Sequence, residues 1–300
     1  MNLNRKNLNT KTPGERFREN LKNNSPLQIL GTPNAYSAIM AKKLGAQAIY
    51  ISGGALSVMS YGLPDLGIAG LEDFLIDTQR MTDAVDTPLI VDIDTGFGGM
   101  FNIERTILKM IKAGAAGVHI EDQVAQKRCG HRPNKQLVSI EEMCDRVSVA
   151  AQAKNQKDSS FFLIARTDAY ASEGLESAIT RAKAYLEAGA DGIFAEALGS
   201  LSDYEKFCQA IKSPVLANIT EFGKTPLFTL SELKSVGVSM ILYPFAATRM
   251  MNAGAEKAYK VLLSQGTQKD LIKDMQTRET MYDYIGYHDY EDRLDQLGKK

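Results

Sequence analysis

The sequence has few cysteines, almost no net charge and no long apolar run. Its 300 residues include only three cysteines, Cys129, Cys144 and Cys208, whose odd number and spacing argue against a disulfide framework and fit no zinc pattern. The formal net charge of −1 gives no overall field that favours nucleic acid or an anionic membrane. No apolar run approaches membrane-spanning length. We therefore expect a cytoplasmic protein, in a reducing compartment, that binds neither nucleic acid nor membrane.

The first residues are polar and rich in asparagine, without the apolar core of a secretory signal. Residues 1–12 hold three basic and no acidic residues, so a transit peptide is the alternative to a flexible N-terminus. The run Thr12-Pro13-Gly14-Glu15 is typical of a helix start, with a capping threonine, an early proline and a glutamate that can complete a capping box. We expect residues 1–12 to be flexible and residues 13–300 to form one domain.

A unit of helix, small-residue turn and short apolar strand repeats along the chain. Expected strands are 27–30, 48–52, 89–94, 117–121, 161–167, 192–196, 214–219 and 240–243. Expected helices are 37–44, 71–84, 102–113, 140–153, 175–188, 202–211, 230–235 and 248–264. Continuous apolar strands alternating with helices predict a parallel sheet that is buried on both faces. Eight such units predict a (β/α)₈ barrel. An open doubly wound sheet is the alternative, but no G-x-G-x-x-G motif follows the first strand.

The chain continues for more than thirty residues beyond the eighth unit, from about residue 267. Residues 268–284 have the apolar spacing of a helix, with Leu271, Ile272 and Met275 on one face. A barrel does not need such an extension, and extensions of this kind often pack on another subunit. We therefore expect an oligomer.

The third expected strand ends in two carboxylates. In Val91-Asp92-Ile93-Asp94 the aspartates are two residues apart, so a strand would direct both to one face. Unpaired carboxylates on an inward face repel each other, and a divalent cation would remove the conflict. Oxygen-only ligation favours Mg²⁺. The alternative is that Asp92 and Asp94 face the loop and cap the next helix.

The second and fourth strands also end in polar residues that share a face. Glu121 could contact the water shell of the metal or orient a neighbouring base, whereas His119 is either part of the site or a satisfied core histidine. Tyr50 precedes Ser52-Gly53-Gly54, whose backbone N–H groups could hold a carboxylate or form a simple turn.

Arginines follow the later strands. An arginine that points into a barrel mouth needs an anion, and its planar guanidinium suits a carboxylate. Arg166 is therefore expected either to bind substrate or to pair structurally with Asp168 or Glu196. Since barrel enzymes keep their chemistry at the C-terminal ends of the strands, the mouth is predicted to carry local positive charge and to bind a small polyanion with several carboxylates.

The loop Lys127-Arg128-Cys129-Gly130-His131 follows the fourth strand. Positive charge favours thiolate over thiol, so Cys129 is expected to exchange protons near neutral pH, with Lys127, Arg128 and His131 tuning its pKa. The alternative is a solvated basic loop that happens to contain a cysteine.

Long motifs in these segments resemble the isocitrate lyase/phosphoenolpyruvate mutase superfamily over nearly the whole chain. They are SYGLPD at 60–65, DIDTG at 92–96, EDQ at 121–123 with KRCGH at 127–131, ARTD at 165–168, LANITEFG at 216–223 and MQTR at 275–278. Arg128 resembles the branch that cleaves methylisocitrate, because members that cleave isocitrate usually have lysine there and phosphonate-handling members usually lack this cysteine. Ala195 departs from the pattern, which has proline before the strand-six glutamate.

The resemblance implies a (β/α)₈ barrel, Mg²⁺ held by Asp92 and Asp94, and a homotetramer of helix-swapped dimers. It implies a substrate site formed by Ser52, Gly53, Gly54, Cys129, Gly130, Arg166, Glu196, Asn218, Ile219, Thr220, Arg249 and Arg278. The implied reaction splits the tricarboxylate (2S,3R)-2-methylisocitrate, an intermediate of propionate catabolism, into pyruvate and succinate.

In the reaction that the resemblance implies, negative charge develops on the departing carbon, and Cys129 protonates it. Tyr50 and Glu121 are candidates for the base that accepts the hydroxyl proton, and His119, Lys127 and His131 are candidate supporting residues. The alternatives are an isocitrate lyase, a decarboxylase, hydrolase or phosphonomutase on the same scaffold, and a barrel that binds dicarboxylates without catalysis.

Overall fold

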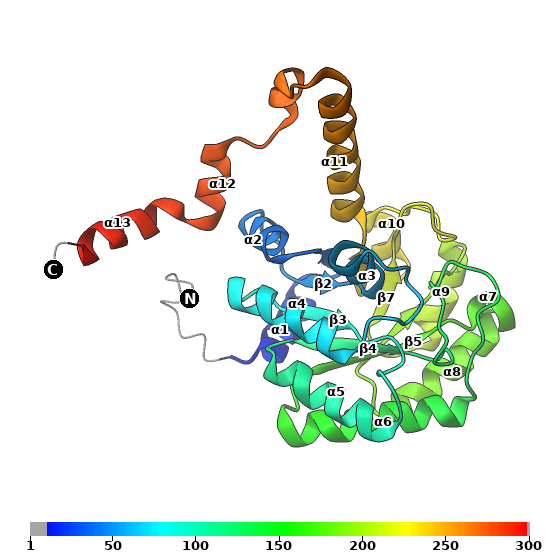
Figure 1. Cartoon of the computed structure of the whole chain (residues 1–300). Helices are drawn as coiled ribbons and strands as arrows, with labels where there is room; N and C mark the ends of the chain where they lie inside the picture. Colours follow the sequence, from blue (N-terminus) through cyan, green and yellow to red (C-terminus); the bar gives the residue numbers. More distant parts are fainter. Residues whose placement is uncertain (1–10, 299–300) are drawn as a thin grey trace.

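The computed structural model describes residues 11–298 and shows a closed barrel of eight parallel strands (Figure 1). The strands are β1 (Leu27–Gly31), β2 (Ile49–Ile51), β3 (Leu89–Asp92), β4 (Gly117–Glu121), β5 (Phe162–Thr167), β6 (Gly192–Ala195), β7 (Val215–Asn218) and β8 (Met240–Tyr243). Each strand pairs with the next, and Leu27 of β1 pairs with Met240 of β8 to close the barrel. The predicted (β/α)₈ fold is confirmed, and the open-sheet alternative is wrong.

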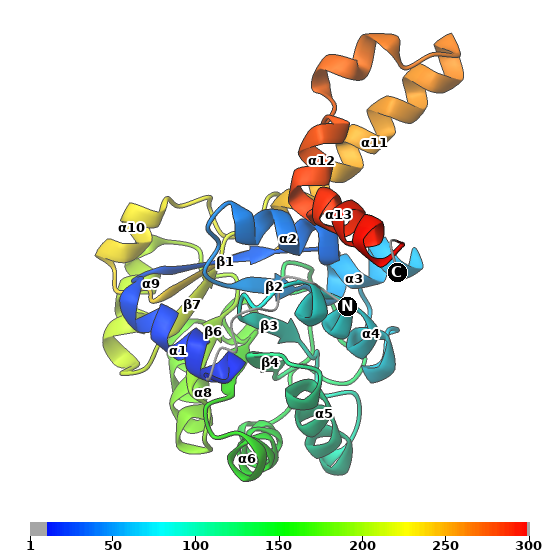
Figure 2. The same ribbon diagram turned by 90° about the vertical axis from the view of Figure 1, so that its left-hand side faces the viewer.

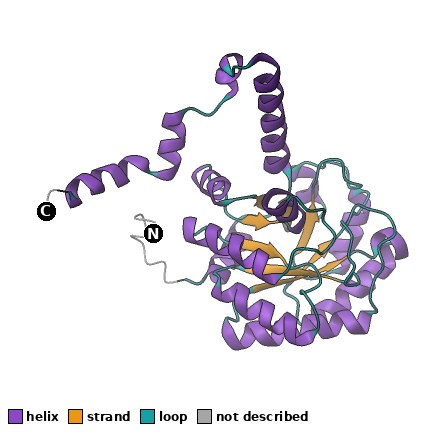
Figure 3. Cartoon of the chain, viewed as in Figure 1, coloured by secondary structure: helices purple, strands orange, loops and turns teal. Residues whose placement is uncertain are grey.

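Helices surround the barrel, and the last ones form an extension that leads away from it (Figure 3). They are α1 (Pro13–Asn23), α2 (Ala35–Lys43), α3 (Gly53–Tyr61), α4 (Leu71–Ala84), α5 (Met100–Lys112), α6 (Ile140–Lys157), α7 (Tyr170–Glu173), α8 (Leu175–Glu187), α9 (Leu201–Ala210), α10 (Leu230–Ser235), α11 (Ala246–Gln265), the 3₁₀ helix η1 (Lys269–Asp274), α12 (Arg278–Ile285) and α13 (Tyr287–Leu297). None of the helices in residues 11–298 combines the length and the apolar character needed to span a membrane.

The helix α1 closes the end of the barrel at which the strands begin. It starts as predicted, because the Glu15 N–H donates to Thr12 Oγ1 at 3.2 Å and the Thr12 N–H donates to Glu15 Oε2 at 2.7 Å. Phe17 is fully buried, and its ring centroid lies 4.9 Å from that of Phe162 on β5. The opposite end of the barrel therefore remains open for a ligand. The rest of the expected flexible N-terminus, residues 1–10, lies outside the described residues.

The strands are buried on both faces, which explains their continuous apolar sequences. One core fills the barrel interior and includes Ile90, Phe162 and Leu216. A larger core lies between the strands and the helices and includes Val91 and Val118. Adjacent residues of a strand thus face different cores. Because the strands themselves are apolar, a ligand site has to use the few polar residues near the strand ends.

Two local predictions near β2 and β3 need correction. The Gly53-Gly54 turn is the first turn of α3, which Ser52 caps by accepting the Ala55 N–H at 3.4 Å. Glycines usually disfavour helices, so sequence reasoning missed this element. Strand β3 ends at Asp92 rather than Asp94, because Asp94 has a φ of +47° that no strand residue adopts.

The predicted single helix over residues 268–284 is also wrong. Residues 269–274 form the 3₁₀ helix η1, and the chain is extended at Met275 before Thr277 caps α12 by accepting the Thr280 N–H at 3.1 Å. Figures 1 and 2 show α11 extending away from the barrel and α12 returning toward α2. The return is fixed by Tyr36, whose hydroxyl donates to Gln276 Oε1 at 2.6 Å.

Candidate active site

A cavity of about 350 Å³ lies at the carboxyl ends of the strands, where most of the predicted site residues meet. Those that line it are Tyr50, Ser52, Gly54, Asp92, Glu121, Lys127, Cys129, Gly130, His131, Arg166, Glu196, Asn218, Thr220 and Arg249. Ile219 does not line it, since its side chain belongs to the core beneath the helices. Arg278 does not either, because it begins α12 in the extension and is exposed.

Asp92 and Asp94 are both buried, with 6% of each residue exposed. The Asp94 N–H donates to Asp92 Oδ1 at 3.0 Å, and the Gly53 N–H donates to Asp92 Oδ2 at 3.0 Å. The Gly53 N–H group is therefore engaged by Asp92 in this structure, and its contact with a substrate carboxylate stays a prediction. Burial, reinforced by the charge of Asp92, raises the pKa of Asp94 to about 7. Two buried carboxylates so close together need a positive partner.

Lys127 is that partner in this structure. Its Nζ lies 2.7 Å from Asp94 Oδ1 and also contacts Asp65. Although burial alone would lower a lysine pKa, the carboxylates of Asp94, Glu121 and Asp65 raise it, so Lys127 stays charged. Its charge is directed at the carboxylates rather than at the neighbouring thiol.

The predicted activation of Cys129 by flanking cations is wrong. Burial raises the pKa of the Cys129 thiol, with a smaller opposing effect from the backbone at His131. Lys127 points to the carboxylates, and Arg128 is exposed to solvent. The thiol therefore keeps its proton at neutral pH, which is the state that a proton donor requires.

His119 lies beneath the cavity and has no exposed surface. Its Nε2 is 2.7 Å from the Tyr50 hydroxyl and 3.5 Å from Asp92 Oδ1. Burial lowers the pKa of His119 to about 4 and raises that of Tyr50 well above its usual value. His119 is thus buried as a core histidine would be, but its contact with Tyr50 also connects it to the site.

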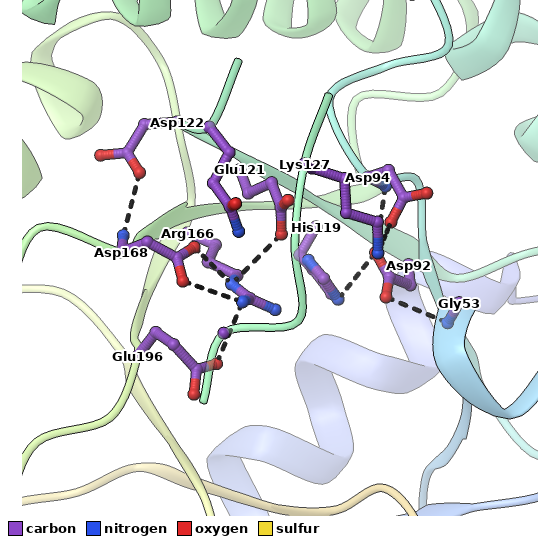
Figure 4. A network of polar contacts seen from close by, with 12 residues as sticks. Gly53, Asp92, Asp94, His119, Glu121, Asp122, Lys127, Arg166, Asp168 and Glu196 are labelled. Atoms are coloured by element: carbon purple, nitrogen blue, oxygen red, sulfur yellow. Dashed lines mark hydrogen bonds and ion pairs between the residues drawn. The ribbon is translucent and has the colours of Figure 1, made fainter. Parts of the chain in front are cut away.

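Arg166 occupies the centre of a network of carboxylates (Figure 4). Its Nε and Nη2 donate to the two oxygens of Asp168 at 2.9 and 3.0 Å. Glu121 Oε2 and Glu196 Oε2 each lie 3.4 Å from the guanidinium. Arg166 is therefore paired with Asp168, as one interpretation predicted, and because it also lines the cavity, its contact with substrate stays a prediction. The pairing fixes the plane of the guanidinium before any ligand binds.

The cysteine loop, residues 127–131, lies over the cavity and is held there by contacts of His131. The His131 Nε2 is 3.0 Å from Glu196 Oε1, and the Lys224 N–H donates to His131 Nδ1 at 3.0 Å. Burial lowers the pKa of His131, in keeping with an imidazole nitrogen that accepts a hydrogen bond. The loop is thus closed onto the segment that follows β7.

Sequence reasoning missed Asp65 and Lys135 as parts of this site. Asp65 pairs with Lys127 across 62 residues, and Lys135 pairs with Asp168 across 33. Asp65 did stand in a recognised motif, but no local signal identified its partner. Lys135 lies in a polar stretch that gave no signal.

Buried carboxylates outnumber buried cations around the cavity, contrary to the predicted local positive charge. The carboxylates are Asp92, Asp94, Glu121, Asp168 and Glu196, and the cations are Lys127, Lys135 and Arg166. Glu121 Oε1 and Asn218 Oδ1 also lack a hydrogen-bond partner among the described residues. This donor set fits a divalent cation. In residues 11–298 no three His, Cys, Asp or Glu side chains gather to hold a metal, so Asp92 and Asp94 would share it with water and substrate oxygens, as Mg²⁺ commonly permits.

Comparisons with known proteins identify the relatives of this chain. A family model described as phosphoenolpyruvate phosphomutase matches residues 17–263. A 2-methylisocitrate lyase of Vibrio cholerae is 57% identical over 292 residues, covering 95% of this chain and 94% of the relative. The 2-methylisocitrate lyase of Escherichia coli K12 is 55% identical, covering 95% and 96%. The crystal structure of a 2,3-dimethylmalate lyase superposes with a TM-score of 0.89 at 33% identity, covering 96% of both chains.

Proposed function

Since this chain belongs to the phosphoenolpyruvate phosphomutase family, within the isocitrate lyase superfamily, we propose that it cleaves (2S,3R)-2-methylisocitrate to pyruvate and succinate. Relatives that share more than half of its residues are 2-methylisocitrate lyases. The structural observation that carries the proposal is the position of Cys129, a protonated thiol beside a cavity that is lined by Arg166 and the buried Asp92.

The cavity offers separate groups for the carboxylates of the substrate. Arg166 lies on one wall, and Arg249 lies on another with its guanidinium over the rings of Phe222 and Phe245, at 5.2 and 5.1 Å. The Arg249 side chain is 43% exposed and 3.3 Å from Glu221, so it is less committed to protein contacts than Arg166. We assign both guanidiniums to substrate carboxylates, because their planar donors match carboxylate geometry.

Cleavage requires a base for the hydroxyl proton and an acid for the departing carbon. Tyr50 is the better-placed base, because its hydroxyl lies 2.7 Å from neutral His119 Nε2, which can take the phenolic proton onward. Electrons of the O–H bond form the carbonyl of pyruvate, while those of the breaking carbon–carbon bond pass to the carbon beside the succinate carboxylate. The Cys129 thiol then donates its proton to that carbon.

Asp92 and Asp94 are the residues that would hold Mg²⁺. When bound, Mg²⁺ supplies electrostatic stabilisation of the oxygen atoms that gain negative charge during cleavage. Around this site, Lys127 neutralises Asp94 and Asp65, and Gly53 fixes the Asp92 carboxylate through its N–H group.

The decisive experiment is a coupled assay of pyruvate release from 2-methylisocitrate, with Mg²⁺ and after its removal by chelation. We expect turnover that depends on the metal. Isocitrate tests the closest rival, and one methyl group is worth only about 1–3 kcal/mol of discrimination, so weak cross-activity is expected. Cleavage of phosphonopyruvate, or calorimetric binding of 2-methylisocitrate without product, would instead support the mutase-type or non-catalytic alternatives.

We also propose that the protein acts as a homotetramer in which the extension of each chain reaches a neighbouring barrel. Its apolar side chains remain largely exposed here, with Ile272 63% and Leu294 69% exposed. Arg278 lies outside the cavity of its own chain, so it would contribute to a site only from a neighbour. A cytoplasmic location remains our expectation for this enzyme.

A further inference from the structure

A single buried lysine ties the loop after Cys129 to the barrel. The Lys135 side chain is only 3% exposed. Its Nζ donates to the Gly130 carbonyl oxygen at 2.6 Å and to Asp168 Oδ1 at 2.7 Å. Because a buried ammonium is costly unless it is paired and hydrogen-bonded, both contacts matter to the position of this side chain.

The Asp168 end of this connection is rigid. Asp168 is fully buried, and its N–H donates to Asp122 Oδ1 at 2.9 Å. The Asp168 carboxylate also accepts two hydrogen bonds from Arg166 (Figure 4). Asp168 therefore holds Lys135 and Arg166 in fixed positions relative to each other.

The Gly130 end lies directly against the substrate-binding groups. A Cβ at Gly130 would stand 2.3 Å from Arg166 Nη2 and 2.7 Å from Glu196 Cγ, so only glycine permits this approach. On the other side of the thiol, the Gln123 side chain accepts the Arg128 N–H and donates to the Arg128 carbonyl, both at 2.9 Å. Both neighbours of Cys129 are thus held by side chains.

We propose that Lys135 is a positioning residue that holds Cys129 over the cavity by joining the Gly130 carbonyl to Asp168. Through Asp168 the loop and Arg166 share one anchor, so the thiol has a defined place relative to the carboxylate that Arg166 binds. The kinetic part of this inference rests on the proposed lyase function, whereas the structural part does not.

The test is Lys135→Met, with Lys154→Met as the matched control. Lys154 is also a buried lysine, 6% exposed and 3.3 Å from Asp191 Oδ2, but this pair lies near the starts of the strands. We expect kcat of Lys135→Met to fall at least about tenfold with KM within about threefold, since a small misplacement can cost about 100-fold. The control should keep kcat within about twofold of the parent.

A second measurement does not need turnover. In a background of Cys144→Ser and Cys208→Ser, iodoacetamide should alkylate Cys129 several-fold faster in Lys135→Met than in the parent or the control. Loss of a nearby positive charge alone would slow alkylation by disfavouring the thiolate, so a faster rate reports a released loop.

The outcomes separate the two proposals. Faster alkylation without any lyase activity in the parent would support the tether and refute the proposed function. Parental kcat together with a parental alkylation rate would overturn the role of Lys135. If circular dichroism shows that Lys135→Met does not fold, Lys135→Gln, which keeps one short donor, decides by the same two measurements.

Discussion

Three side chains of the site, those of Tyr50, His119 and Cys129, are uncharged at neutral pH. Burial raises the pKa of Tyr50 and of Cys129 and lowers that of His119. Tyr50 and Cys129 therefore each hold a proton that they can donate, and His119 has a ring nitrogen that can accept one. This arrangement suits a reaction in which one proton is removed and another is delivered.

Replacing Cys129 by serine tests its role as the acid. A hydroxyl is a far weaker proton donor than a thiol, so we expect kcat to fall by several orders of magnitude, on the order of 1,000-fold or more. Titration calorimetry should still detect substrate with little change in affinity, because the cavity walls are intact. Turnover at the parental rate would remove Cys129 from the mechanism.

The buried imidazole of His119 predicts a pH effect on stability. The pKa of His119 is lowered from 6.5 to about 4 by burial, so the unfolded chain binds a proton at a pH where the folded chain does not. This group therefore costs the folded state stability as the pH falls from 6.5 toward 4, about 2–3 kcal/mol between pH 7 and 4.5.

The matched measurement uses His119→Gln. Urea unfolding at pH 7 and pH 4.5, at one protein concentration, should show a smaller loss for the variant than for the parent. Acidic side chains titrate in both proteins, so the difference isolates the imidazole. Equal losses in the two proteins would contradict a neutral His119.

Sequence reasoning found most of the candidate residues that line the cavity but misjudged their partners. Tyr50, Glu121 and Arg166 were identified because a strand end predicts their location. The sequence predicted that the charge of Lys127 acts on Cys129, two residues further along the chain, yet its partners are Asp65 and Asp94. Adjacency in sequence says little about side-chain direction in a loop, and a partner 62 residues away leaves no local pattern.

At the level of secondary structure, the cysteine loop is the element on which activity depends. Gly130 packs against Arg166 and Glu196 with no room for a Cβ. We expect Gly130→Ala to displace the loop and to lower kcat by roughly 100-fold, because the thiol would lose its position. Steady-state kinetics on the purified variant would measure this.

Gly254→Ala is the control for that substitution. Gly254 lies in α11, and a Cβ there meets nothing within 4 Å. Alanine favours a helix over glycine by about 1 kcal/mol, so this variant should melt at the same or a higher temperature and keep its kcat. A Gly130→Ala enzyme as active as Gly254→Ala would show that the close packing is not needed.

The strands could be predicted from sequence because both of their faces are buried, which leaves a continuous apolar signature. The helix α3 could not be predicted, because its first two residues are glycines, which are typical of a turn, and its only N-terminal signal is the capping Ser52. The single helix predicted for the extension was wrong for another reason. Residues 269–274 have the apolar spacing of an α-helix but form a 3₁₀ helix. The interruption of the helix at Met275–Thr277 contains no proline or glycine from which it could be predicted.

At the level of the whole molecule, the extension predicts that active sites are shared between subunits. If Arg278 acts on a neighbouring barrel, Arg278→Ala should lower kcat/KM at least about tenfold, because a charged contact to a carboxylate is lost. Arg293→Ala, in the exposed helix α13 of the same extension, is the matched control and should leave kcat/KM nearly unchanged.

Mixing distinguishes sharing from an effect within one chain. Cys129→Ser and Arg278→Ala subunits, dissociated and reassembled together, should be more active than either variant alone, since some sites then combine an intact thiol with an intact arginine. The assay is pyruvate release before and after mixing, with subunit mass followed by light scattering. A mixture no more active than its components would place Arg278 outside any shared site.

The closed ring of strands has one more consequence. Every strand from β1 to β8 has a neighbour on both sides, so the barrel presents no free strand edge onto which another polypeptide could add. Within residues 11–298, the surfaces left for association between folded copies are those of helices and loops. Substitutions on those surfaces should yield smaller oligomers rather than fibrils, because the closed barrel uncovers no template for cross-strand growth.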